Sequence, residues 1–218
     1  MITVTLERPW LHARLARPMR VLSWAPHGAG WRVTGHVLWR EVTDADLGPG
    51  VDAARWLAAR LPPGGDVAMM TSCDIGEWQE ARATAGGVAA HAVVTLGLSN
   101  AESVGARLPW QPVRAGAGHG TINILVATDA PLSRAAQLEA VSIATEARTA
   151  ALMDCDIRLA TGRATGTGTD CLVLACPPGG RLRHAGLHTA AGEAIGAATL
   201  AAVSCAAGRW LAARAGAG

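Results

Sequence analysis

The sequence predicts one α/β (or α+β) domain over residues 1–218, in which a mixed β-sheet is covered by two long helices and shorter ones. Short apolar runs, typical of buried strands, alternate with two long segments that have a helical pattern. Half of the residues are hydrophobic and 17% are charged, which indicates a compact chain rather than a disordered one. The length suffices for one core, and neither an internal repeat nor a long linker divides it.

The expected elements follow in chain order. Strands are predicted early in the chain, at residues 2–6, 20–24 and 35–39. A short helix follows and ends in a Pro-Pro-Gly-Gly turn, and we place it over residues 51–61. Three further strands are apolar enough to be buried, and we place them at residues 66–75, 89–98 and 121–127. Strands that are interleaved with two long helices favour a mixed sheet covered by those helices.

The clearest helix follows Asp129, which we expect to be the N-cap because Pro131 suits the first turn. At 100° per residue, one face of this helix carries a stripe formed by Leu138, Val141, Thr145, Thr149 and Leu152. Glu146 and Arg148 border the stripe on opposite sides. The two threonines favour the interpretation of this face as the wall of a pocket, and the alternative is that its charged borders are simply solvated. A final helix, rich in alanine and glycine, is predicted over residues 189–213.

The most specialised segment is the loop at residues 164–170, where Gly and Thr alternate before Asp170. Glycine leaves backbone N–H groups accessible, and threonine adds hydroxyls that converge on a polar or anionic group. The loop leads directly into an apolar strand at residues 171–176. We therefore interpret the segment as an active-site loop. The alternative is a turn in which Asp170 caps nearby N–H groups.

Composition excludes several classes of function. The net charge is +2 and the arginines form no basic run, so nucleic acid is not an expected partner. The chain contains no Lys and no Tyr, which rules out a Schiff-base lysine, a P-loop lysine and a tyrosine acid. Five cysteines without a CxxC pair indicate neither a disulfide framework nor a zinc ribbon. No secretory signal is visible, and we judge the apolar run at residues 194–207 too short to span a bilayer, so we expect a cytoplasmic protein without membrane contact.

Four segments in register resemble the adenosylcobinamide amidohydrolase (CbiZ) family, and they lie at residues 97–101, 120–124, 145–152 and 165–170. Residues 185–193 are also similar to the end of that family's sequences. The resemblance implies hydrolysis of the amide that joins a corrin-ring propionyl side chain to aminopropanol. Adenosylcobinamide would give adenosylcobyric acid, in corrinoid salvage, without a cofactor. Arg148 stands where the family usually has lysine, and a cation that only positions a carboxylate could be either residue.

Amide hydrolysis needs an activated nucleophile, an oxyanion stabiliser and an acid for the leaving amine. We expect Asp170 to be the general base and the amides of Gly166 and Gly168 to form the oxyanion site. Glu146 is the natural second carboxylate, because two acids in one pocket can hold different protonation states. Cys73 is an alternative nucleophile, although it ends an apolar strand as many inert cysteines do.

The remaining site residues are expected to bind the substrate. Asn100 and Asn123 are the only asparagines, and their amides suit the amide groups that fringe a corrin ring. The other expected binding residues are Thr145, Arg148, Thr165, Gly166, Thr167, Gly168, Thr169 and His188. No metal is expected, because the alternative ligand set of His184, His188 and Glu193 has weak spacing.

Alternative functions remain open at this level. One is a different amide or ester hydrolase on the same fold, and another is a non-catalytic corrinoid or anion binder. The expected partner is a small corrinoid, and a homo-oligomer is compatible with the sequence.

Overall fold

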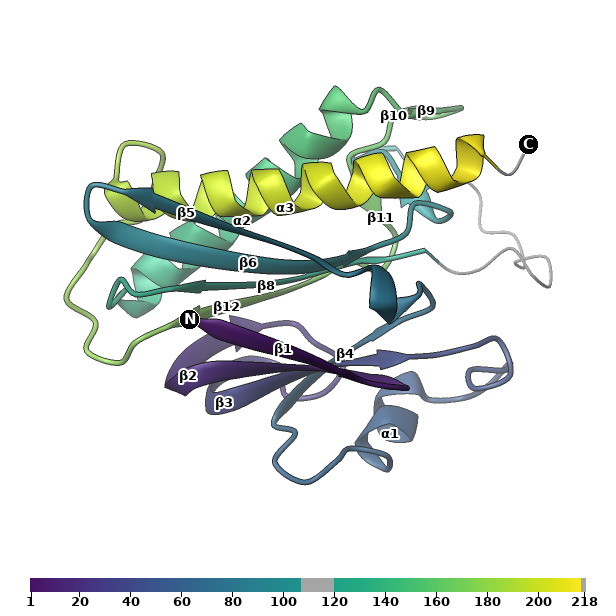
Figure 1. Ribbon diagram of the computed structural model, residues 1–218, viewed down its shortest axis with the longest axis horizontal. Coiled ribbons are helices and arrows are strands. Elements are labelled where there is room, and N and C mark those ends of the chain that lie inside the picture. Colours follow the sequence, from purple (N-terminus) through teal and green to yellow (C-terminus); the bar gives the residue numbers. More distant parts are fainter. Residues whose placement is uncertain (107–119, 217–218) are drawn as a thin grey trace.

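A computed structural model describes residues 1–106 and 120–216 of the chain (Figure 1). Its principal sheet has eight strands, in the order β4-β3-β2-β12-β8-β6-β5, with β1 paired to β2. The strands of the N-terminal part are β1 (Ile2–Glu7), β2 (Trp10–Ser23), β3 (Gly30–Glu41) and β4 (Val67–Thr71). The remaining strands of the sheet are β5 (Gln79–Ala85), β6 (Val88–Leu96), β8 (Ile122–Thr128) and β12 (Cys171–Cys176). Because β12 runs parallel to β8 and antiparallel to β2, the sheet is mixed, as predicted.

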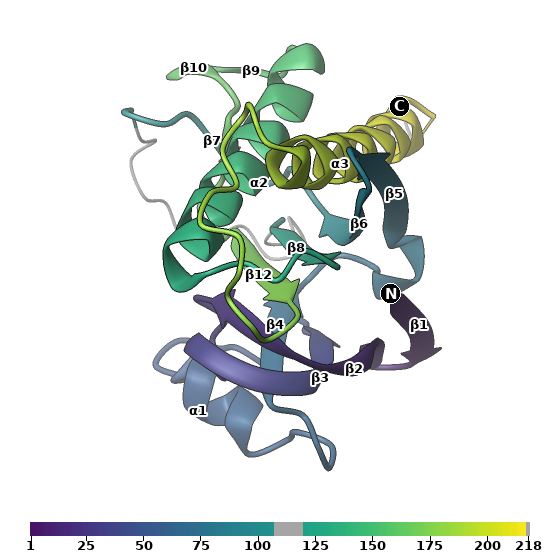
Figure 2. The ribbon, with the colours of Figure 1, turned by 90° about the vertical axis from the view of Figure 1, so that its left-hand side faces the viewer.

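Two long helices cover one face of this sheet (Figures 1 and 2). They are α2 (Arg134–Asp154) and α3 (Ala190–Ala215), which pack on each other, α3 over β5 and β6 and α2 beside β12. A shorter helix, α1 (Ala53–Ala58), lies near β3 and β4, and a 3₁₀ turn, η1 (Ile75–Glu77), follows β4. The α/β fold class with a mixed sheet and two long helices is therefore confirmed.

Two pairs of two-residue strands complete the elements. β7 (Ala101–Glu102) pairs with β11 (Gly166–Thr167), and β9 (Arg158–Leu159) pairs with β10 (Gly162–Arg163). The β7–β11 pair is the important one for function, because it fixes the Gly-Thr loop to the segment that follows β6.

The sheet curls, and the two largest hydrophobic clusters of the described residues lie on its two sides. The first lies between the sheet and the helices and includes Ile122, Ile124 and Leu172. The second lies inside the curl, where β1–β4 pack on the other face of β8 and β12, and it includes Trp39, Met69 and Leu125. Residues alternate between the two cores along β8 and β12, as expected for strands buried on both faces.

The start of α2 differs from the sequence prediction. Ser133, rather than Asp129, is the N-cap, and its hydroxyl accepts a hydrogen bond from the amide of Ala136. The Asp129 carboxylate instead accepts the amide of Ala89 and joins the ends of β8 and β6. Pro131 therefore lies in the connection that precedes the helix.

The buried face of α2 also differs from the predicted stripe. Alanines dominate the buried face, and Leu138 is 54% exposed. Small side chains are used there because α2 packs closely on α3. Of the predicted stripe, Leu152 is buried, whereas Val141, Thr145 and Thr149 are partly exposed on the side of the helix. The stripe therefore borders the core instead of filling it.

The last helix agrees with the predicted bounds, but it is longer and more apolar than the run at residues 194–207 that we judged too short to span a bilayer. α3 has 26 residues, and its length and composition, with a mean hydropathy of 1.4 over its best window, would suffice to cross a membrane. However, 56% of that window is buried inside the fold. This is the burial of a core helix that packs on a sheet and on α2.

Candidate active site

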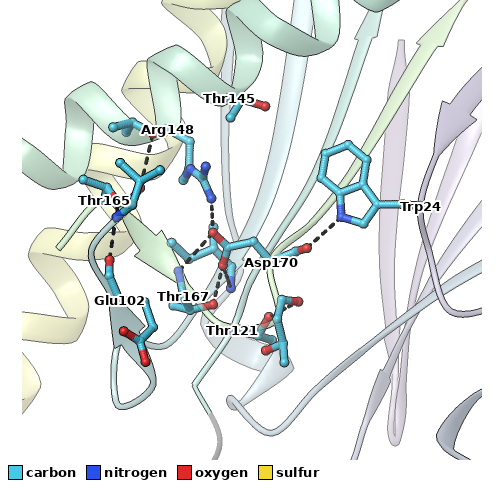
Figure 3. A network of polar contacts seen from close by, with 12 residues as sticks. Trp24, Glu102, Thr121, Thr145, Arg148, Thr165, Thr167 and Asp170 are labelled. Carbon is cyan, nitrogen blue, oxygen red and sulfur yellow. Dashed lines mark hydrogen bonds and ion pairs between the residues drawn. The ribbon is translucent and has the colours of Figure 1, made fainter. Parts of the chain in front are cut away.

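The carboxylate of Asp170 is the centre of a polar network at the start of β8 and β12 (Figure 3). Its Oδ1 accepts the amide of Ile122 at 3.1 Å and the hydroxyl of Thr167. Its Oδ2 accepts the amide of Thr167 at 3.1 Å and the guanidinium of Arg148. Four donors thus favour the ionised carboxylate, because each stabilises the negative charge.

Arg148 reaches this network from the side of α2, and the ion pair is mostly buried. The side chains of Arg148 and Asp170 are 16% and 13% exposed. Burial lowers the pKa of Arg148 from its ordinary value, and a guanidinium with Asp170 beside it remains cationic at neutral pH. Its Nε is buried and has no hydrogen-bond partner within the described residues.

The four family-like segments meet at this network. The amide of Gly97 bonds to the carbonyl of Thr121 at 3.0 Å, and that of Gly168 bonds to the carbonyl of Asn100 at 3.2 Å. The hydroxyl of Thr121 bonds to the carbonyl of Thr169 at 2.9 Å. The ion pair of Arg148 and Asp170 adds the segment on α2. Segments far apart in the sequence therefore surround one carboxylate.

The Gly-Thr loop owes its shape to this packing. A Cβ on Gly166 would lie 2.7 Å from both Nη1 of Arg148 and Oδ2 of Asp170, so only glycine fits beside the ion pair. The hydroxyl of Thr165 accepts the amide of Val104 at 2.8 Å. The Gly168 amide is already bonded to Asn100, so it is not available for the oxyanion site that we expected it to share with Gly166.

A small cavity of about 20 Å³ lies beside the ion pair. Its polar lining comes from Thr145, Arg148 and Asp170, and its apolar lining comes from Trp24, Ile122, Ile124, Cys171 and Leu172. This volume is enough for about one water molecule. Burial raises the pKa of the neighbouring Cys171 thiol to about 12, so this cysteine remains an unreactive thiol at neutral pH.

A larger cavity of about 350 Å³ lies near the same end of β8, under the last turns of α3. Cys73, Gly97, Ser99 and Gly120 line it, together with Arg209 and Trp210 of α3. The thiol of Cys73 lies 3.8 Å from the carbonyl of Thr121, so Thr121 contacts the lining of this cavity and the Asp170 loop. No histidine is among the described residues that line this cavity.

Two expected site residues lie away from the network. The carboxylate of Glu146 is on the exposed side of α2, where it accepts the hydroxyl of Ser142 at 3.0 Å, so the structure does not pair it with Asp170. His188 is exposed in the loop that precedes α3. That loop ends beside the turn between β5 and β6, because Ala190 packs on Gly86 of that turn. The β5–β6 turn is at the opposite end of the sheet from Asp170.

The two asparagines occupy different environments. Asn100 packs its side chain against Gly168 and so belongs to the candidate site. Asn123 is 1% exposed and lies inside the curl, where its amide donates to the carbonyl of Met70 at 2.7 Å. This contact joins β8 to β4, and Asn123 is not among the described residues that line either cavity.

The alternative metal ligands do not gather. Across residues 1–106 and 120–216, no group of three or more His, Cys, Asp or Glu side chains is arranged to hold a metal ion. His184 is 76% exposed and lies 3.7 Å from Glu139 rather than beside His188 and Glu193.

Trp24 is a site residue that sequence reasoning missed. Its indole N–H donates to the carbonyl of Asp170 at 2.8 Å, and its ring lines the small cavity although the residue is 49% exposed (Figure 3). The available signal was an indole at the end of an apolar strand, just before Pro26. Its partner is far away in the sequence, so spacing could not reveal the contact.

Comparison with known proteins gives a family match over nearly the whole chain. The family model described as "CbiZ: Adenosylcobinamide amidohydrolase" matches residues 2–215. An adenosylcobinamide amidohydrolase of Halobacterium salinarum is 36% identical over 115 residues, which cover 50% of this chain and 44% of that protein. An uncharacterized protein of Methanocaldococcus jannaschii is 39% identical over 79 residues, or 35% of this chain and 31% of that protein. The matches thus span less than half the length of these curated relatives.

Solved structures give more distant similarities. A beta-aminopeptidase of Burkholderia sp. has a TM-score of 0.46 at 14% identity, covering 90% of this chain and 78% of that one. A protein of Pyrococcus horikoshii OT3 has a TM-score of 0.41 at 10% identity, covering 94% and 82%. At these values the similarity says nothing about activity.

Proposed function

Because the chain belongs to the adenosylcobinamide amidohydrolase family, we propose that it hydrolyses the amide between a corrin-ring propionyl side chain and aminopropanol. The observation that carries the proposal is the meeting of four family-like segments around the Asp170–Arg148 ion pair. The products are adenosylcobyric acid and aminopropanol, which fits a role in corrinoid salvage.

The reaction adds one water across the C–N bond. The water oxygen bonds to the carbonyl carbon, the C–N bond breaks, and the amine leaves with one proton from the water. We assign Asp170 as the base that takes this proton and returns it to the amine nitrogen. The cavity beside Asp170 and Arg148 has the volume of about one water molecule and so suits the nucleophile.

The four donors around Asp170 restrict how it can act. A base needs a free lone pair, so water must replace one donor on the carboxylate. The amides of Ile122 and Thr167 are fixed by the backbone, whereas the Thr167 hydroxyl can rotate away. We therefore propose that water binds Oδ1 in place of this hydroxyl during turnover.

Arg148 has two proposed roles. Its Nη1 holds Asp170 in place, and its Nε is a buried donor without a partner in the described part of the chain. A donor of this kind can stabilise the oxyanion that forms on the amide carbonyl, which replaces the expected contribution of the Gly168 amide. Asn100, Thr145 and the threonines of the loop are proposed to contact the substrate around this point.

A covalent route through Cys73 is the second candidate, because this thiol lines the larger cavity. In that route the sulfur would displace the amine and form a thioester, which water would then hydrolyse. Direct attack by water needs no such intermediate. We favour water because the Cys73 thiol donates to a backbone carbonyl, and no histidine that could deprotonate it is among the described residues that line the cavity.

The test is incubation of the protein with adenosylcobinamide, followed by mass spectrometry of the corrinoid. We expect adenosylcobyric acid to form with wild-type protein and with the Cys73→Ala variant. Unchanged adenosylcobinamide at high protein concentration would overturn the function. The covalent route would replace water attack if the mass of the intact protein showed an acyl adduct and the Cys73→Ala variant showed neither this adduct nor turnover.

The proposal also covers the cellular location of the reaction and its need for a metal or cofactor. We propose that the reaction takes place in the cytoplasm and needs neither a metal nor a cofactor. The described cysteines are all free, which is the state that a reducing compartment maintains. The only partner required is the corrinoid substrate.

A further inference from the structure

The partly exposed stripe of α2 leads from the protein surface to the candidate site. Leu138, Val141 and Thr145 follow one another at helical spacing and end at Arg148, which holds Asp170. Leu138 is 54% exposed at the outer end, and Thr145 lines the small cavity at the inner end. One side of α2 thus joins an exposed apolar residue to the ion pair.

The adjacent part of the sheet exposes large apolar side chains. Trp31 and Val33 on β3 are 44% and 67% exposed. Trp31 lies opposite Leu22 of β2, which in turn lies opposite Leu174, a member of the helix-side core. Trp31 and Val33 therefore point to the same face of the sheet as α2.

Direct contacts join the two surfaces. The indole N–H of Trp31 donates to Oε1 of Gln137 at 3.0 Å, and the guanidinium of Arg134 lies 5.5 Å from the Trp31 ring. Leu138 is one turn beyond Arg134 on the same side of α2. At the inner end, Trp24 contacts Asp170 and lines its cavity. We call the surface formed by Trp24, Trp31, Val33 and Leu138 the tryptophan face.

We propose that the tryptophan face binds the corrin ring of the substrate, so that the propionyl amide reaches Asp170. This inference rests on the proposed function. The cavity at Asp170 holds about one water, so the ring must lie outside it, and Trp24 of the tryptophan face also lines that cavity. A corrin ring is broad and flat and carries amides at its edge.

The chemistry of the face matches this ligand. Two indole rings offer large flat contact areas at a low cost in side-chain entropy. Val33 and Leu138 extend the apolar area, and the Arg134 guanidinium at its border can donate to the ring's amide carbonyls. An apolar face beside a buried ion pair also keeps bulk water away from the scissile amide.

The test compares Trp31→Ala and Leu138→Ser with matched controls elsewhere. The controls are Trp56→Ala, on α1, and Leu187→Ser, which is 73% exposed before α3. Calorimetry measures binding of adenosylcobyric acid, which carries the same ring and has no amide to aminopropanol. We expect Trp31→Ala to weaken binding about tenfold and to raise KM for adenosylcobinamide similarly, with kcat within about threefold. Leu138→Ser should have a smaller effect in the same direction.

The outcomes separate this inference from the proposed function. If wild-type protein binds adenosylcobyric acid at the tryptophan face but does not hydrolyse adenosylcobinamide, only the proposed function fails. If it hydrolyses adenosylcobinamide and the Trp31 and Leu138 variants bind as wild type does, only the tryptophan face is wrong. Equal weakening by the controls would also overturn it. A change of oligomeric state in Trp31→Ala, with unchanged corrinoid binding, would show that a second copy occupies the face.

Discussion

Replacing Asp170 by asparagine tests how strongly the protein depends on the buried ion pair. Asparagine keeps one acceptor oxygen and turns the other into an NH₂ group. Each oxygen of Asp170 accepts two hydrogen bonds, so the NH₂ group opposes two donors in either orientation. The substitution also leaves the Arg148 cation buried without its counter-charge.

The expected loss of stability follows from these contacts. Removing one partner of a buried pair costs about 3–5 kcal/mol. The side chains are 13–16% exposed, so water reaches them slightly, and we expect the lower end, about 3 kcal/mol. This is a large part of the roughly 5–15 kcal/mol that stabilises a typical domain.

Urea unfolding followed by tryptophan fluorescence measures this loss. In Arg148→Met/Asp170→Asn the unpaired cation is absent, so the double variant should be more stable than the sum of the single losses predicts. Turnover is then compared at a temperature where Asp170→Asn remains folded, and we expect it to fall by at least about a hundredfold. A stability loss below about 1 kcal/mol, with near wild-type turnover, would refute the reasoning and leave Asp170 as a loop cap.

Three further predictions concern other parts of the molecule. Gly97→Ala would place a Cβ in the volume of the Cys73 sulfur and should lower the free energy of unfolding in urea by about 1–3 kcal/mol. Adding Cys73→Ala should restore part of this loss, and a double variant whose loss equals the sum of the single losses would contradict the steric cause. Burial, Arg14 and His12 lower the pKa of His36 below its ordinary 6.5, so its contribution to stability is present above pH 6.5 and is lost as the pH falls through the native value. His36→Gln should therefore flatten the fall in unfolding free energy between pH 7 and 5, and an unchanged slope would argue against it. Turnover should persist after chelation and dialysis, whereas loss that one divalent ion reverses would point to a metal site.

Some elements could be predicted because their local patterns match their environments. β8 and β12 are continuous apolar runs and are buried on both faces. β5 was missed because its sequence, Gln-Glu-Ala-Arg-Ala-Thr-Ala, has few residues with high strand propensity, and its pairing with β6 decides its structure. The start of α2 was misplaced because Asp129 and Ser133 are both good N-caps, and only the contact with Ala89 shows which one is used.

The site shows the same division between local and tertiary information. The Gly-Thr loop and Asp170 could be singled out from residue type, and the structure places them in one polar network. The sequence indicated Glu146 as the second acid beside Asp170, whereas the structure places Arg148 there and leaves Glu146 exposed. The two residues lie on different sides of α2, and the packing of α2 on β12 turns Arg148 inward. The contact of Trp24 with Asp170 joins residues 146 positions apart, beyond the reach of any local pattern.

The most direct test of the proposed hydrolysis is the stoichiometry of its two products. Wild-type protein is incubated with adenosylcobinamide, and aminopropanol and adenosylcobyric acid are quantified in the same samples over time. We expect them to appear in equal amounts, at a rate that Asp170→Asn lowers by at least about a hundredfold under conditions where it is folded. Adenosylcobinamide that remains intact, or a corrinoid product that forms without aminopropanol, would contradict amide hydrolysis at this site.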